Sequence, residues 1–286
     1  MSVKIENINC TYMPKTPFEK TALYDINVEI KKGELVGIIG HTGSGKSTLL
    51  QHFNGLIMPP KNSDGKVIID GEVLTKKNVR EIRKKVGYVF QYPEYQLFEE
   101  TVYKDIAFGL KKLKLTEEEE RSAVLKAAVT VGLSEDILEK SVYDLSGGQK
   151  RRVAIAGVIV MNPDYLILDE PAAGLDPAGK FDILSFAKKL REERGTAVVI
   201  VSHSMEDIAE IADRIIVMND GRIVMDGSPC EIFSKKEKLN EIGLSVPEIT
   251  DLFIRLNAEF PWISKEVYTV EDSVKVLASL LDGGDA

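Results

Sequence analysis

One run of consecutive residues has the types and spacing to hold a polyphosphate: Gly40, His41, Thr42, Gly43, Ser44, Gly45, Lys46, Ser47 and Thr48. Its glycines let the backbone approach phosphate oxygens closely, so that successive N–H groups can point at those oxygens. Lys46 can then reach the β- and γ-phosphates, while the hydroxyl of Ser47 is placed to bind Mg²⁺. The run therefore predicts a P-loop that binds a nucleoside triphosphate.

The residues on either side predict the strand and the helix that a P-loop joins. Residues 35–39 are apolar and partly β-branched, as in a short buried strand. Residues 48–55 predict a helix that ends at a glycine, Gly55. Without this context the run would be a glycine-rich turn with a solvated lysine. With it, the phosphate site is the favoured interpretation.

Two consecutive acids, Asp169 and Glu170, follow a second predicted strand at residues 165–168. Asp169 is placed to hold Mg²⁺, and Glu170 is a candidate to orient or deprotonate the water that attacks the γ-phosphate. Neighbouring side chains on a strand point to opposite faces unless the chain turns. Pro171 predicts such a turn, which would let Glu170 face the nucleotide.

Three further residues lie at the ends of predicted strands, where ligands of α/β sheets bind. Gln91 could contact Mg²⁺ or the attacking water, although a surface amide is equally compatible with its position. His203 could contact the γ-phosphate, although a lone histidine is more often a capping or surface residue. Tyr12 could stack on an adenine ring or be an ordinary half-buried strand tyrosine.

A second candidate anion site is formed by Ser146, Gly147, Gly148 and Gln149 at the start of a predicted helix that continues to about residue 160. Taken alone, this segment could be no more than a capped helix. The remaining pattern predicts an α/β protein with a mostly helical insertion over residues 93–143, hairpin turns at Asp70 and Asp220, and a helix over residues 181–194. Further strands are expected at residues 3–12, 24–30, 67–69, 84–90 and 196–201.

Composition and charge argue against several classes of function. The chain has 286 residues, a net charge of −8 and a sequence pI near 5.2, which argues against general nucleic-acid binding. Its two cysteines, Cys10 and Cys230, match no metal or redox motif and suit a reducing compartment. The first residues lack the apolar region of a signal peptide. The longest apolar or glycine run, residues 153–161, is shorter than the roughly 20 residues of a membrane helix. Any membrane path is therefore expected in another chain.

The order of these motifs resembles the ATP-binding cassette (ABC) family: residues 40–47, Gln91, residues 145–149, residues 165–169 with Glu170, Asp176 and His203. The resemblance covers about residues 1–235. It implies a P-loop NTPase fold of the ABC ATPase type, with a mixed parallel core sheet, an N-terminal antiparallel β subdomain and an α-helical subdomain at about residues 93–146. It also implies ATP and Mg²⁺ as cofactors, and adenine stacking as the role of Tyr12.

Three longer stretches, residues 40–46, 90–102 and 169–177, resemble the ATP-binding subunits of energy-coupling factor transporters, the A-prime type in particular. This resemblance implies an ATPase at the cytoplasmic face of the cell membrane that powers uptake of vitamins or trace metals. The implied partners are a second ATPase subunit, related or identical, a transmembrane coupling (T) subunit and substrate-binding membrane (S) subunits.

Two regions have open interpretations. Residues 236–286 form a small helical extension with apolar stripes from residue 249 to 256 and from 274 to 281. The extension either packs on its own domain or contacts the second ATPase subunit. Residues 92–98 are aromatic and apolar, which suits a contact with a membrane subunit or local core packing.

Alternative functions are the ATPase of another ABC importer class, a soluble non-transport ABC ATPase, and a module that binds ATP without hydrolysing it. The single cassette and the absence of a heptad run oppose the soluble class. Intact Asp169, Glu170 and His203 oppose a module without hydrolysis.

Overall fold

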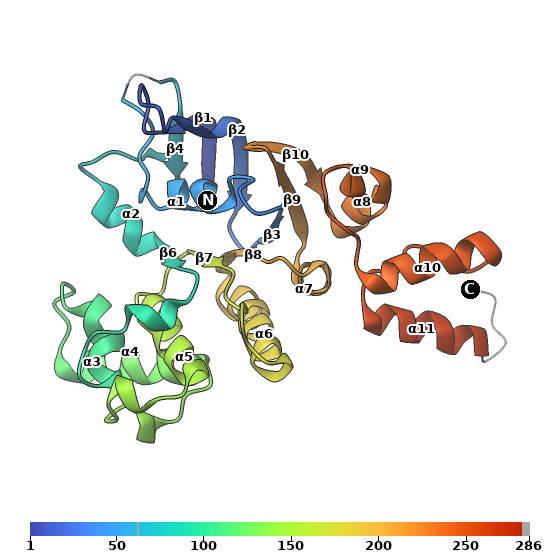
Figure 1. The fold of residues 1–286 in the computed structure, drawn as a ribbon. Helices are drawn as coiled ribbons and strands as arrows, with labels where there is room; N and C mark the ends of the chain where they lie inside the picture. The colour runs from blue at the N-terminus through green and yellow to red at the C-terminus, as the bar shows by residue number, and fades with distance from the viewer. Residues whose placement is uncertain (62, 282–286) are drawn as a thin grey trace.

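The computed structural model describes residues 1–61 and 63–281, and its N-terminal part is an antiparallel sheet with the order β2-β1-β4-β5 (Figure 1). Alternate buried side chains in the long strands place one face of this sheet on the core. The strand bounds are Ser2–Tyr12 for β1, Lys20–Lys31 for β2, Lys66–Ile69 for β4 and Glu72–Val73 for β5.

The second sheet has the order β10-β9-β3-β8-β7-β6 and is parallel except for β10. Its central strands are buried along their whole length, which explains their continuous apolar sequence. Their carboxyl ends therefore meet at one edge. The bounds are Leu35–Ile39 for β3, Val86–Val89 for β6, Tyr165–Asp169 for β7, Ala197–Val201 for β8, Arg214–Asn219 for β9 and Arg222–Gly227 for β10.

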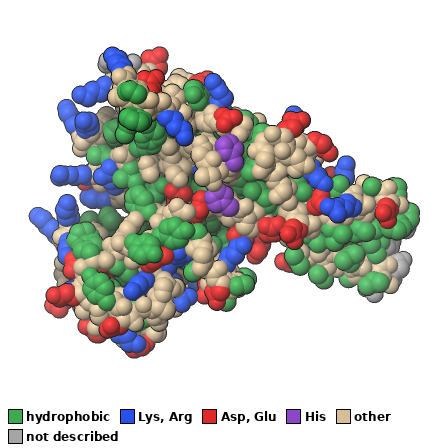
Figure 2. All heavy atoms as spheres, in the orientation of Figure 1, with side chains coloured by type: hydrophobic (Ala, Val, Ile, Leu, Met, Phe, Trp, Pro, Cys, Tyr) green, Lys and Arg blue, Asp and Glu red, His purple; other side chains and the backbone are tan. Residues whose placement is uncertain are grey.

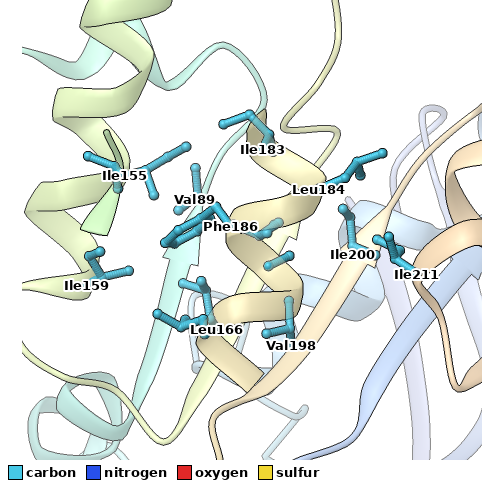
Figure 3. Packing of buried hydrophobic residues seen from close by; sticks show 14 of the residues in the cluster. Val89, Ile155, Ile159, Leu166, Ile183, Leu184, Phe186, Val198, Ile200 and Ile211 are labelled. Atoms are coloured by element: carbon cyan, nitrogen blue, oxygen red, sulfur yellow. The ribbon is translucent and has the colours of Figure 1, made fainter. Parts of the chain in front are cut away.

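Helices cover both faces of the parallel sheet. Helix α1 spans Lys46–Phe53 and α7 spans Met205–Ile211. Figure 3 shows Phe186 of α6 beside Val89 and Leu166 of the sheet, with Ile155 of α5 nearby. Helix α6 spans Pro177–Arg194, so it begins four residues before the predicted position 181. The predicted apolar position Phe181 is exposed, because the sheet-facing stripe of α6 runs instead through Ile183, Leu184, Phe186, Ala187 and Leu190.

The predicted helical insertion is confirmed as helices that pack beside the sheet (Figure 1). The side chain of Thr101 accepts the cap hydrogen bond of α3, and Thr116 forms a capping box with Glu119 at the start of α4. The bounds are Val102–Ala107 for α3, Glu117–Thr130 for α4 and Gly147–Ile159 for α5, with 3₁₀ turns at Pro93–Gln96 (η1), Phe108–Leu110, Glu135–Ile137 and Val142–Asp144.

Two predicted strands start at the wrong residue: β2 begins at Lys20 and not at residue 24, and β6 does not begin at residue 84. Lys84 and Lys85 belong to a short helix, α2 (Val79–Lys85), and the strand begins only at Val86. The basic residues lie in the last turn of α2, where they interact favourably with the helix dipole.

The C-terminal region consists of helices α8 (Pro229–Phe233), α9 (Lys236–Glu241), α10 (Glu248–Glu259) and α11 (Val270–Leu281). Leu239 of α9 packs into the main core, whereas Phe253 of α10 belongs to a separate small cluster with Ile263 and Val267. Helices α10 and α11 lie side by side and project away from the sheets (Figure 1). The last five positions of the predicted extension, 282–286, lie outside the described residues.

Part of the predicted apolar stripes remains exposed. Ile249 and Leu256 pack against the small cluster, but Val274, Leu277 and Leu281 of α11 face solvent, as does Leu252 of α10. Figure 2 shows the resulting hydrophobic surface over the projecting lobe. Within residues 1–61 and 63–281, no helix is both long and apolar enough to cross a membrane.

Candidate nucleotide site

The loop between β3 and α1 has a shape that only glycine permits at two positions. Gly45 has φ 101°, and a β-carbon there would lie 2.6 Å from the carbonyl oxygen of Ala22. Gly43 has φ 84° and faces open space. Lys46 Nζ donates to the carbonyl oxygens of Gly40 (2.7 Å) and His41 (3.0 Å). The loop is therefore wrapped around its own lysine, with backbone exposed beside it.

The turn between β9 and β10 braces this loop from behind. The N–H of Gly221 donates to the carbonyl of Ser44 (3.0 Å), and that of Tyr24 donates to the carbonyl of Gly221 (2.8 Å). A ring nitrogen of His41 lies 2.9 Å from Oδ1 of Asn219. Residues far apart in sequence therefore fix the loop, and the predicted hairpin at Asp220 supplies part of its support.

Asp169 ends β7 and is buried behind the loop. Its Oδ2 accepts a hydrogen bond from the hydroxyl of Tyr88 (2.9 Å), and Ser47 Oγ donates to its Oδ1 at 3.5 Å. Burial raises the pKa of Asp169, while the hydrogen bonds from Tyr88 and Ser47 lower it. For Lys46 burial has the opposite effect and lowers the pKa, because it disfavours the charged ammonium group. The negative charges of Glu170 and Asp169 oppose this shift.

Sequence reasoning missed Tyr88 as a partner of Asp169. Tyr88 lies on β6, which pairs with β7, and the available signal was a single tyrosine in an otherwise aliphatic strand three residues before Gln91. The hydrogen bond holds the carboxylate of Asp169 in one orientation.

Glu170 is brought together with Gln91 and His203. Its backbone has φ 51°, so the chain does turn immediately after β7, as Pro171 predicted. Gln91 Nε2 donates to Oε2 of Glu170 (2.8 Å), and Nε2 of His203 lies 2.7 Å from Oε1. Three strand ends therefore deliver these side chains to one point.

A cavity of about 450 Å³ connects this point with the P-loop. The hydroxyl of Tyr12 lies 3.1 Å from Oγ1 of Thr48 at its side. Gly40 and Ser44 are buried in the loop and support it from within. The cavity lining consists of Tyr12, Lys20, Ala22, Thr42, Gly43, Gly45, Lys46, Ser47, Thr48, Gln91, Glu170 and His203.

The oxygen donors at the base of the site suit Mg²⁺. Ser47 supplies a hydroxyl, Asp169 a carboxylate and Gln91 an amide, all of them hard oxygen ligands of the kind that Mg²⁺ takes together with phosphate oxygens and water. Among the described residues, no group of three His, Cys, Asp or Glu side chains could hold a metal ion by itself. The donor set therefore fits a cation that arrives with a phosphate ligand.

Comparison with known proteins identifies the family. The sequence profile of the ABC transporter family matches residues 23–173. The chain is 55% identical to the energy-coupling factor transporter ATP-binding protein EcfA2 of Clostridium perfringens, over 98% of this chain and 99% of that protein. The chain belongs to the ABC transporter family. It is also 45% identical to EcfA2 of Listeria monocytogenes, over the full length of both chains.

Solved structures of ABC proteins confirm the predicted fold. The structure of cbiO1 from Clostridium perfringens, part of the ABC transporter complex cbiONQ, aligns with a TM-score of 0.74 and 40% identity over 87% of this chain and 97% of that chain. A dimeric, post-hydrolysis structure of the ATP-binding cassette MJ0796 bound to ADP and Pi aligns with a TM-score of 0.70 and 32% identity, over 79% and 98% of the two chains. The chain is thus an ABC ATPase that binds ATP.

The second candidate anion site of this ABC ATPase, Ser146 to Gln149, contributes no residue to the lining of the P-loop cavity. Ser146 Oγ accepts from the N–H of Gln149 (3.3 Å), and Oε1 of Gln149 accepts from the N–H of Ser146 (3.0 Å), so the segment does cap α5. Apart from chain neighbours and the backbone of α5 itself, no described atom lies within 4 Å of where β-carbons on Gly147 and Gly148 would be.

Proposed function

We propose that this chain is the ATP-hydrolysing subunit of an energy-coupling factor importer, and that Glu170 is its general base. The observation that carries the proposal is the convergence of Gln91 and His203 on the carboxylate of Glu170 at the mouth of the P-loop cavity. Such an arrangement holds a carboxylate where it can orient water and accept its proton. The full-length similarity to EcfA2 proteins supports the transporter class.

Each remaining site residue has a proposed part. The P-loop from Gly40 to Thr48 binds the phosphates through its N–H groups and Lys46, and Tyr12 stacks on adenine. Ser47, Gln91 and Asp169 would hold Mg²⁺, which neutralises charge on the phosphates when bound. His203 positions Glu170 and lies near the γ-phosphate.

The complete site requires a second ATPase subunit, either related or identical. In the segment formed by Ser146, Gly147, Gly148 and Gln149, the first two residues are exposed, and none of the four lines the chain's own cavity. In the proposed pair, each chain covers its partner's nucleotide with this segment. The dimeric state of the similar cassette MJ0796 supports such a pair.

The membrane partners are proposed to be a transmembrane coupling (T) subunit and substrate-binding (S) subunits, which select vitamins or trace metals. The ATPase would lie at the cytoplasmic face of the cell membrane. Residues 92–98 are the proposed docking segment, because Tyr95 is 84% exposed and Tyr92 and Phe98 also face solvent. Leu97, by contrast, packs against the main core.

We also propose the division into an ATPase domain at residues 1–235, with its helical subdomain at about 93–146, and a C-terminal extension at residues 236–286. The separate cluster around Phe253 supports an extension with its own small core. The helix that contains Leu239 nevertheless packs on the ATPase domain.

The variant Glu170→Gln tests the catalytic assignment. It keeps the size and one acceptor oxygen but cannot accept a proton, so we expect ATP binding to persist while turnover falls by roughly 10²-fold or more. Equilibrium binding of labelled ATP and release of phosphate measure the two effects. Glu118→Gln, an exposed glutamate of α4, is the control. Turnover close to wild type in Glu170→Gln would remove Glu170 from this role.

A further inference from the structure

A nearly buried arginine joins three segments of the ABC ATPase. Arg151 lies in the second turn of α5 and is 3% exposed. Its Nε and Nη2 donate to the two carboxylate oxygens of Glu94, at 3.1 Å and 2.9 Å. Its Nη1 donates to the carbonyl oxygens of Pro171 (3.0 Å) and Ala173 (2.7 Å). One guanidinium thus makes four hydrogen bonds to two different segments.

The segments that meet at Arg151 have different parts in the proposed function. Glu94 lies in η1, within the docking segment 92–98. Arg151 lies five residues after Ser146, on the helix that the second anion site opens. Pro171 and Ala173 belong to the turn that immediately follows Glu170. One side chain on the helix opened by the candidate anion site therefore contacts both the docking segment and the turn after Glu170.

The geometry requires arginine at this position. The planar guanidinium offers donors in a fixed fork, so it can bind a carboxylate on one side and two carbonyls on another. Lysine has a single ammonium centre and cannot span these partners at once. Glu94 is also largely buried, and a buried carboxylate without its cation is disfavoured, so the two side chains act as a unit.

We propose that Arg151 is a positioning residue that couples the docking segment to the catalytic turn through its pair with Glu94. The proposal rests on the proposed function, because it assigns residues 92–98 to contact with the membrane subunit. When that segment moves, Glu94 moves Arg151, and Arg151 carries α5 and the turn after Glu170 with it.

The test uses the complete transporter, reconstituted in vesicles, with the variants Arg151→Lys, Glu94→Gln and the double variant. We expect Arg151→Lys to lower kcat for ATP by roughly tenfold or more, because the turn that bears Glu170 loses its anchor. KM for ATP should stay within about twofold of wild type, since the P-loop is not altered. Glu94→Gln should lower substrate uptake per ATP hydrolysed.

The double variant distinguishes a shared role from two separate ones. If Arg151 and Glu94 act as a unit, the double variant should hydrolyse ATP no more slowly than Arg151→Lys alone. The matched control is Arg152→Lys, because Arg152 is the neighbouring arginine and its own side chain pairs with Asp182 of α6 (3.1 Å) and not with Glu94. Its kcat and uptake should stay close to wild type.

Several results would overturn the proposal. The first is wild-type kcat and uptake in both single variants. The second is a double variant whose loss of kcat equals the product of the two single losses. The third is a rise in KM for ATP without a fall in kcat. Binding of ATP and the melting temperature are measured for every variant. If Arg151→Lys does not fold, the uptake ratio of Glu94→Gln decides alone. Failure of the wild-type chain to assemble with membrane subunits would instead refute the proposed function.

Discussion

The adjacent carboxylates of Asp169 and Glu170 have different surroundings. Asp169 lies behind the loop, where burial raises its pKa and Tyr88 fixes its orientation. Glu170 has turned out of the strand and meets polar side chains at the cavity. Burial of Asp169 therefore costs stability when its carboxylate is charged, as is common at functional sites.

The variant Asp169→Asn is expected to stabilise the nucleotide-free protein while abolishing turnover. Because burial raises the pKa of Asp169, the native state binds its proton more tightly than the unfolded chain does. At low pH the side chain of Asp169 is protonated and costs the native state nothing. As the pH rises through the native pKa, the buried carboxylate becomes charged and the free energy of unfolding falls. We expect a melting temperature higher by roughly 2–4 °C at neutral pH, the shift for about 1 kcal/mol in a chain of this size.

Thermal unfolding of wild type and Asp169→Asn between pH 4 and pH 8, without nucleotide or Mg²⁺, measures this difference. The gap should narrow as the pH falls, since protonation removes the charge from the wild-type side chain. Asp64→Asn, at an exposed position, is the control. A gap that widens toward low pH would contradict the burial argument.

The site residues that belong to a local sequence motif could be predicted from the sequence. Asp169 is the last residue of β7, and the P-loop, Glu170, Gln91 and His203 each come after a strand. The parallel order of the sheet brings these strand ends to one edge. The supporting contacts were not predictable in this way. The pairs Tyr88–Asp169 and Glu94–Arg151 join residues 81 and 57 positions apart, and nothing in either local sequence marks its partner.

Within the docking segment, residues 92–98, the side chains differ in burial, so only the exposed ones are suitable for substitutions that test docking. The sequence alone left residues 92–98, which include Tyr95 and Leu97, open to a contact with a membrane subunit or to local core packing. In the structure Tyr95 is exposed, whereas Leu97, directly after the 3₁₀ turn, is half-buried and packs against the main core.

Replacing Tyr95 by alanine is expected to weaken copurification with the membrane subunit without changing the fold. An exposed aromatic side chain contributes much of the energy of an interface and little to the stability of a free chain. The yield of membrane subunit captured by tagged ATPase, with the melting temperature of the free ATPase, measures both effects. Phe18→Ala, at another exposed aromatic position, is the control. Equal capture by Tyr95→Ala and wild type would reject the docking role.

Most elements followed from periodicity and capping residues, and the misplaced boundaries have physical causes. Helix α2 has a single buried side chain, Ile82, so it shows no apolar period. Helix α6 begins at Pro177 because Asp176 caps it, a signal stronger than the apolar pattern that suggested residue 181. The exposure of Phe181 depends on which side of α6 faces the sheet. The sequence of the helix alone does not give the position of the sheet.

For the molecule as a whole, the projecting helices α10 and α11 leave an apolar face uncovered (Figure 2). Its members are Leu252, Val270, Val274, Leu277 and Leu281. The small cluster around Phe253, Ile263 and Val267 is too limited to bury both sides of α10 and α11. The face suits the proposed contact between ATPase subunits.

The variant Val274→Lys is expected to weaken association of the two ATPase subunits, since it places a charge in the centre of that face. Sedimentation or capture of a tagged partner subunit measures the association, and the melting temperature of the isolated chain should change little. Lys275→Gln, at the neighbouring exposed position, is the control. Undiminished association in Val274→Lys would assign the face to something other than the ATPase pair.

The brace behind the P-loop has a consequence for synthesis of the protein on the ribosome. Strand β3 lies between β8 and β9, and the carbonyl of Ser44 is held by the N–H of Gly221. Both neighbours are made long after residues 40–48, and contacts so distant in sequence form late. A nascent chain therefore contains the phosphate-binding sequence without the phosphate-binding shape. We therefore expect the nascent chain to bind ATP only after its core sheet is complete.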